Sequence, residues 1–283
     1  MRKWVLIAFT LMAFAANSVL CRIALREGHA DPETFSALRL GSGALVLLLF
    51  LLAARGYRSI RWNLVNTLLL TTYVFLFSFA YVHLDAAVGA LLLFGAVQIY
   101  MVIAGTMQGE RMGPRKMAGM LIAITGIAVL LLPGASMPSA THAVMMIASG
   151  LAWGAYSVRG KSVTEPAGAT TGNFLLSVPV AALLLLLLPG HISADKWGVM
   201  LALVSGGVTS GMAYVLWYAI LREIASSTAS TLQLSVPCLA ALGGALFLGE
   251  LPDARIVIAT LLVLAGILTV IVSDRPATPK EGG

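Results

Sequence analysis

The composition of the chain is that of a membrane protein. Of its 283 residues, 59% are hydrophobic and 11% are charged, and the mean hydropathy is +0.93. These values exclude a water-soluble globular domain of this length. The net charge of +6 follows from the placement of basic residues around membrane segments, so it does not indicate nucleic-acid binding.

Apolar runs separated by short polar breaks follow one another along the whole chain. A helix of roughly 20 mostly apolar residues crosses a bilayer, so the sequence predicts an all-α membrane protein of ten transmembrane helices. The predicted helices begin near Trp4, Thr34, Asn63, Ala86, Pro114, His142, Gly172, Trp197, Ser226 and Asp253.

The first apolar run follows Arg2 and Lys3, as the core of a signal peptide would. It continues past signal-peptide length, and the residue before Cys21 is not the small one that a lipoprotein cleavage site needs. We therefore expect a retained helix. Cys21 and Cys238 both fall inside predicted helices, so neither a structural disulfide nor redox chemistry is indicated.

The basic residues predict the orientation of the chain. Most of the 18 lysines and arginines fall on one side of the predicted helices, which is typical of the cytoplasmic side. Both termini are therefore expected in the cytoplasm. The basic residues on the opposite side are Arg22, Arg26, Arg39, Lys196 and Arg255.

The two halves of the chain resemble each other. Shifting the first half onto the second superimposes Gly109–Glu110 on Gly249–Glu250 and Gly126–Ile127 on Gly266–Ile267. Each half holds five predicted helices, an odd number, so the second half is expected to be inverted in the membrane. Inverted repeats are typical of secondary transporters, whose substrate site lies near the midplane. The predicted divisions are 3–132 for the first repeat, 141–273 for the second and 274–283 for a cytoplasmic tail.

Several segments resemble the EamA-type transporters of the drug/metabolite transporter superfamily. They are MAYVLWYAILREIASSTASTLQLSVPCLAALGGALFLGE in the second half, and FAANSVLCRIAL, FSALRLGSGALVLLL and GERMGPRKMAGMLIAITGIAVLL in the first. The resemblance covers nearly the whole chain and implies a ten-helix inner-membrane carrier that exports metabolites, amino acids or toxic compounds. Val97 and Phe14 depart from the family, which often has proline and tryptophan at these positions.

Acidic residues are missing from the predicted membrane interior. All 12 aspartates and glutamates fall at predicted helix ends or in loops, whereas a proton relay usually needs an intramembrane carboxylate. The small multidrug-resistance relatives use one in the first helix, where this chain has Asn17. We therefore expect a facilitated exporter of a small neutral or zwitterionic metabolite, such as an amino acid.

An anionic substrate is the alternative, because a phosphorylated metabolite would need a cation in the cavity. Arg22 and Arg39 are the candidates for such a site. Each lies within two turns of the outer end and is expected to extend toward the membrane surface. At Arg39 the resemblance favours a structural role. Multidrug or toxic-compound efflux is a further alternative.

Aromatic and amide side chains at mid-helix positions are the remaining candidates for the site. Tyr214 and Trp217 share one helix face with Tyr218, and the first half carries Phe75, Ser78 and Phe79 at the matching positions. On the sixth helix Trp153 and Tyr156 lie opposite Phe14 and Asn17 of the first. Packing against lipid or other helices is the alternative role for any single ring.

A polar face in the ninth run gives the last part of the predicted site. Ser226, Ser230, Gln233 and Pro237 share it, and the proline is expected to kink the helix and free a carbonyl. The alternative is hydrogen bonding between helices. Gln98 and Tyr100 carry the same two interpretations. The predicted substrate-binding residues are Asn17, Ser78, Gln98, Trp153, Tyr156, Tyr214, Trp217 and Gln233, with Pro237 as the helix kink.

Enzymatic function is not indicated by any motif. An intramembrane metalloprotease would need an HExxH motif, which the sequence lacks, and the four histidines fall in different predicted loops. No catalytic residue, metal or cofactor is therefore predicted. The expected partners are a small-molecule substrate and the lipid bilayer, with no nucleic acid. A homodimer and a channel are left open.

Overall fold

The computed structural model describes most of the chain: residues 2–54, 59–107, 113–132, 138–160, 162–188, 192–221, 232–233 and 235–273. Secondary structure in these ranges is helical, apart from an isolated β-bridge between Ala30 and Ala194. The all-α prediction is therefore confirmed. The predicted tail, 274–283, and the polar residues Ser226 and Ser230 lie outside the described residues.

Ten helices are found in the described chain, when α8, η2 and α9 are taken as one continuous helix. The seventh begins at Pro166, six residues before the expected Gly172. Of the ninth run, the structure describes a helix from Ser235 onward. The elements are α1 (Arg2–Arg26), α2 (Pro32–Ala54), α3 (Leu64–Tyr81), α4 (Ala86–Met107), α5 (Pro114–Leu131), α6 (Ala140–Gly160), α7 (Pro166–Leu187), α8 (Lys196–Gly206), η2 (Gly207–Met212), α9 (Ala213–Leu221), α11 (Ser235–Leu248) and α12 (Ala254–Ser273).

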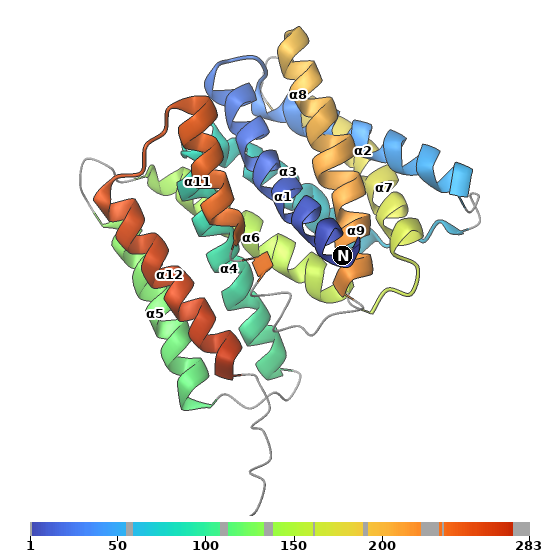
Figure 1. The fold of residues 1–283 in the computed structure, drawn as a ribbon. Helices are drawn as coiled ribbons and strands as arrows, with labels where there is room; N and C mark the ends of the chain where they lie inside the picture. Colours follow the sequence, from blue (N-terminus) through green and yellow to red (C-terminus); the bar gives the residue numbers. More distant parts are fainter. Residues whose placement is uncertain are drawn as a thin grey trace, which may run out of the picture.

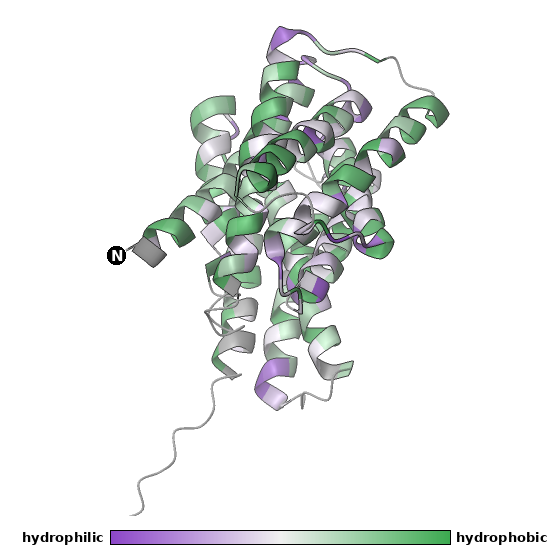
Figure 2. Cartoon of the chain, turned by 90° about the vertical axis from the view of Figure 1, so that its right-hand side faces the viewer, coloured by the Kyte–Doolittle hydropathy of each residue, from purple (hydrophilic) through white to green (hydrophobic). Residues whose placement is uncertain are grey.

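Seven helices of the described chain are long and apolar enough to cross a membrane. They are α1 to α5, α7 and the continuous α8–η2–α9 helix. In α11 and α12 the apolar segments are shorter, Ser235–Leu248 and Ala254–Gly266. Figure 2 shows hydrophobic residues along the helix shafts and hydrophilic residues mainly at helix ends and connections. The chain is therefore a multi-pass membrane protein.

The helices form one bundle in which α1 has a central place (Figure 1). On the side seen in that view, α1 lies between α8 and α11, while α3, α4 and α6 lie behind it. At one edge α5 and α12 lie side by side. The inverted relation of the two halves stays a prediction.

Two connections meet at one end of the bundle, where α1 ends and α8 begins. The backbone N–H of Asp31 donates to the Ser193 carbonyl at 3.0 Å, and that of Asp195 donates to the His29 carbonyl at 2.9 Å. His29 Nδ1 also lies 2.7 Å from Asp195 Oδ2, and this hydrogen bond raises the pKa of the imidazole above 6.5. The ion pair therefore stabilises this contact below pH 6.5 and is lost as the pH rises through the raised pKa. Arg22 lies near the end of α1. We therefore call this end of the bundle, where α1 ends and α8 begins, the Arg22 end.

Glycine allows α8 to approach α2 closely. A Cβ atom on Gly206 would overlap the backbone carbonyl of Arg39 and the hydroxyl of Ser42. Backbone atoms cannot move aside as a flexible side chain can, so the contact between these helices needs glycine at this position. By contrast, a Cβ on Gly41 would meet nothing within 4 Å.

We expect Gly206→Ala to destabilise the protein and Gly41→Ala to leave it unchanged or slightly more stable. Overpacking typically costs about 1–3 kcal/mol, whereas alanine gains up to about 1 kcal/mol over glycine inside a helix. The midpoint of thermal unfolding in detergent measures both variants. Equal midpoints would show that the close approach of α8 to α2 is not as described.

Candidate functional site

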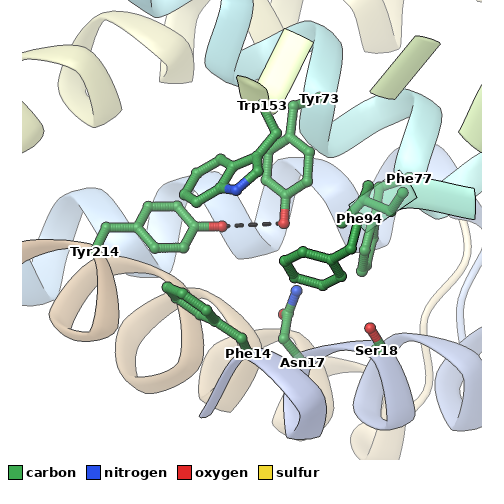
Figure 3. Close-up of a pocket in the computed structure, with 9 residues that line it drawn as sticks. Phe14, Asn17, Ser18, Tyr73, Phe77, Phe94, Trp153 and Tyr214 are labelled. Carbon is green, nitrogen blue, oxygen red and sulfur yellow. Dashed lines mark hydrogen bonds between the residues drawn. The ribbon is translucent and has the colours of Figure 1, made fainter. Parts of the chain in front are cut away.

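A small cavity lies among α1, α3, α4, α6 and α9 (Figure 3). Its volume of about 10 Å³ corresponds to roughly one water molecule, so this conformation has no room for a metabolite. Aromatic rings form most of the wall, and polar groups of α1 lie at one edge. The lining residues are Phe14, Asn17, Ser18, Tyr73, Phe77, Leu93, Phe94, Trp153 and Tyr214.

The rings around the cavity contact one another, which closes it. Trp153 packs against Tyr214 with ring centroids 4.6 Å apart and against Tyr73 at 5.0 Å. Phe14 presents an edge to Tyr214 at 5.9 Å and to Trp217 at 5.7 Å. These side chains come from α1, α3, α6 and α9, so a change in the tilt of any of these helices changes the size of the cavity.

Three of the predicted substrate-binding residues line this cavity: Asn17, Trp153 and Tyr214. Two others are buried beside it without lining it. The Ser78 hydroxyl donates to the Val74 carbonyl of its own helix at 3.0 Å, and the Tyr156 hydroxyl accepts a hydrogen bond from Asn173 Nδ2 at 3.2 Å.

The other three predicted residues, Gln98, Trp217 and Gln233, share a different property. Each is buried and carries a side-chain atom without a hydrogen-bond partner: Nε2 of Gln98, Nε1 of Trp217 and Oε1 of Gln233. A buried polar atom without a partner typically costs about 1–3 kcal/mol. Such atoms are therefore expected where a ligand or water supplies the missing bond.

Helices α7 and α11 each contain a proline past their first residue. Pro237 lies in the first turn described for α11, so the kink that we predict there stays a prediction. Pro179 lies inside α7 and was not among the predicted helix kinks.

Tyr73 and Phe77 are cavity residues that the sequence analysis missed. They lie on α3 and line the wall, whereas the predicted face of this helix was Phe75, Ser78 and Phe79. The signal was present, since Tyr73, Phe77 and Tyr81 recur at every fourth position and so share one helix face.

A short π-helix, η2, connects this cavity to α1 and α2. It spans Gly207–Met212, and π-helical turns often occur at functional sites. Thr209 donates to Asn17 Oδ1 at 3.2 Å, and Ser205 of α8 donates to the same oxygen at 2.7 Å. Ser210 accepts a hydrogen bond from Arg39 Nε at 2.9 Å. The π-helical turn therefore directs two neighbouring side chains to two different helices.

Arg39 lies deep in the protein, contrary to our expectation that it extends to the surface. Its side chain is 0% exposed, and Nη2 donates to the hydroxyls of Tyr73 at 2.9 Å and Tyr214 at 3.1 Å. The guanidinium carbon also lies 5.2 Å and 5.0 Å from the ring centroids of Tyr73 and Phe77. Arg39 is therefore held directly behind the cavity wall.

Arg22 is buried as well, but carboxylates surround it at its end of the bundle. Its Nε donates to Glu250 Oε1 at 2.7 Å and its Nη2 to Asp85 Oδ1 at 3.0 Å. Nη1 donates to the carbonyls of Tyr81 and Val82 at 2.9 and 2.8 Å. This network joins α1 to the α3–α4 and α11–α12 connections and closes the Arg22 end.

A larger and apolar cavity lies elsewhere, between α1, α8–η2 and α11. Its volume is about 510 Å³, and its lining is almost entirely aliphatic, for example Val19 and Leu242. Thr209 is the one polar side chain among its described lining residues. Its lining suits hydrocarbon and not a polar solute.

The comparisons with known proteins agree with this architecture. The profile of the EamA-like transporter family matches residues 2–132 and 141–272. An uncharacterised protein of Pseudomonas aeruginosa is 44% identical over 99% of this chain and 98% of its own. A probable terminal-alkyne amino-acid exporter of Streptantibioticus cattleyicolor is 28% identical over 71% of this chain and 69% of its own. A crystal structure with 20% identity matches at a TM-score of 0.69, over 95% of this chain and 99% of that one, which shows a shared fold.

We expect Glu250→Gln to destabilise the protein far more than Asp85→Asn. Both carboxylates pair with Arg22, but the Glu250 side chain is 6% exposed and that of Asp85 is 46% exposed. Removing one partner of a buried ion pair typically costs about 3 kcal/mol or more, against less than about 1 kcal/mol for an exposed pair. Thermal unfolding midpoints of the two variants measure the difference. A larger effect at Asp85 would contradict the described network.

Proposed function

Because the chain belongs to the EamA-like transporter family, we propose that it exports a small neutral or zwitterionic metabolite, such as an amino acid, across the bacterial inner membrane by alternating access. The relative from Streptantibioticus cattleyicolor, a probable amino-acid exporter, supports this substrate class. The aromatic wall of the cavity suits a partly apolar solute.

The observation that carries this proposal is the position of the unpartnered polar atoms. Gln98 follows Phe94 by one turn on α4, and Trp217 follows Tyr214 by one turn on α9. Both helices run away from the Arg22 end. The unpartnered groups of Gln98 and Trp217 therefore lie beyond the cavity wall on the side away from the Arg22 end, as a substrate path would require.

The closed Arg22 end supports alternating access. An ion network joins α1 to two connections there, while the central cavity holds about one water molecule. In the orientation that the basic residues predict, the Arg22 end is the outer end. The conformation is then one in which the outer gate is closed, and export requires Arg22 to separate from Glu250.

A phosphorylated substrate is less well supported. That alternative relied on both Arg22 and Arg39. Every nitrogen of the Arg22 side chain already donates to a carboxylate or carbonyl oxygen of the protein. Multidrug efflux stays an alternative that a transport screen separates from amino-acid export.

Two inverted repeats with both termini in the cytoplasm are part of the proposal. The separate matches of one family profile to residues 2–132 and 141–272 support an internal repeat.

In a variant with Cys21 and Cys238 replaced by serine, a cysteine at Ser136 should react with an impermeant maleimide added to intact cells, and a cysteine at Ser59 should not. Ser136 itself lies outside the described residues. The opposite labelling pattern would reverse the predicted orientation.

Gln98→Leu should slow transport without destabilising the protein. Removing a buried amide nitrogen without a partner should leave the unfolding midpoint unchanged or raise it. If this amide binds substrate, the same change should slow counterflow in proteoliposomes roughly tenfold or more. The probes are labelled amino acids, sugar phosphates and cationic dyes, each assayed separately.

Thr125→Val is the matched control, because Thr125 lies on α5 and its hydroxyl donates to the Leu121 carbonyl of the same helix at 2.9 Å. Counterflow should be unchanged in this variant. Transport of sugar phosphates alone, or of dyes alone, would replace the proposal with the corresponding alternative. Normal amino-acid counterflow by Gln98→Leu would remove Gln98 from the site.

A further inference from the structure

The Arg39 guanidinium is a buried cation surrounded by neutral groups. Its described hydrogen-bond partners are the hydroxyls of Ser210, Tyr73 and Tyr214. Among the described residues, Arg22, Arg26 and His29 form ion pairs with carboxylates, and none of these pairs involves Arg39. Burying an unpaired charge is costly, so buried charges are normally paired.

The guanidinium also has unused hydrogen-bond donors. Of its five N–H groups, those on Nη1 are buried and have no acceptor. Arg22 provides the internal comparison, because all three of its nitrogens have carbonyl or carboxylate acceptors. Arg39 therefore lacks both a counter-ion and an acceptor for Nη1, and one oxyanion would supply both.

We propose that Arg39 is the anchor for a carboxylate group of the transported solute. The proposal rests on the function proposed above and specifies which group the substrate must carry. A carboxylate matches the planar fork of a guanidinium and forms charge-assisted hydrogen bonds with it. The hydroxyls of Tyr73 and Tyr214 line the cavity and contact Arg39, so they provide the connection between an entering carboxylate and the guanidinium.

The charge balance favours a carboxylate over a phosphate monoester. One carboxylate neutralises the single charge of Arg39, whereas a phosphate monoester carries close to two negative charges at neutral pH. The second charge would need another free cation. Arg22, the other buried arginine of α1–α2, is already paired with Glu250 and Asp85.

The geometry of Arg39 fits a fixed anchor. The rings of Tyr73 and Phe77 lie about 5 Å from the guanidinium carbon, within the range of a cation–π interaction. Ser210, on the π-helical turn η2, accepts a hydrogen bond from Nε at 2.9 Å. These contacts orient the side chain before any anion arrives, which lowers the entropic cost of binding.

The test compares two probes that differ in charge but hardly in shape, isovalerate and isovaleramide. Purified full-length protein in detergent is titrated with sodium isovalerate, with isovaleramide and with sodium chloride as the ionic-strength control. Thermal unfolding and intrinsic tryptophan fluorescence, to which Trp153 and Trp217 contribute, report binding. We expect the acid to bind roughly tenfold or more tightly than the amide, because a charge-assisted hydrogen bond contributes more than a neutral one.

Variants separate Arg39 from other cations. Arg39→Gln should abolish the preference for the acid, and Arg39→Lys should keep part of it, because lysine keeps the charge but not the fork. Arg255→Gln should behave as wild type, since Arg255 does not line the central cavity and donates to the Leu132 carbonyl at 2.6 Å. If Arg39→Gln fails to fold, Arg39→Lys tests the assignment instead, because an acid anchored at Arg39 must lose part of its preference over the amide in that variant.

Equal affinity for the two probes, no binding of either, or an acid preference that persists in Arg39→Gln would each overturn the proposal. Failure of the Arg39 anchor and failure of the proposed transport function give different results. Proteoliposomes that carry an amino acid and its amide equally well would support the transporter and refute the Arg39 anchor. A strong acid preference without any counterflow would support the anchor and refute the transporter.

Discussion

The burial of Arg39 determines how several parts of the chain are placed relative to one another. A guanidinium inside a hydrocarbon environment must find its partners within the protein, and here they come from α3, η2 and α9. The hydroxyls of Tyr73 and Tyr214 lie 3.1 Å apart, so both accept a hydrogen bond from the same nitrogen of Arg39. Gly206 permits the close contact of α8 with α2 at the Arg39 backbone. The cavity wall and this arginine therefore depend on the same set of helix contacts.

Hydropathy predicted the helices because a bilayer requires long apolar segments with internally paired backbones. It predicted type and order well and boundaries less well, as the early start of α7 at Pro166 shows. The interruption at Gly207–Met212 was not predictable in this way. A π-helical turn shifts the helix periodicity by about one residue, but Lys196–Ile220 as a whole is apolar enough to cross a membrane, so the shift leaves no visible signal in hydropathy. Its effect on side-chain direction, with Thr209 toward α1 and Ser210 toward α2, appears only in three dimensions.

The candidate site was partly predictable from helix periodicity. Asn17, Trp153 and Tyr214 were found because polar or aromatic residues at mid-helix positions stand out from an aliphatic background. Tyr73 and Phe77 were missed because matching the two halves led to a neighbouring face of α3. The position of Arg39 was missed for a different reason. Distance from a helix end predicted that the side chain reaches the surface, whereas the buried tyrosine hydroxyls retain it inside.

The uncompensated charge of Arg39 also affects ions that are not substrates. Two unit charges about 6 Å apart repel each other by about 3 kcal/mol at an effective dielectric constant of 20, a factor of more than 100 in occupancy. Hydronium and sodium ions entering the central cavity would meet this repulsion, as cations do at arginine-guarded pores. A carrier that changes conformation many times per second could then move its solute without short-circuiting the proton-motive force of the membrane that contains it.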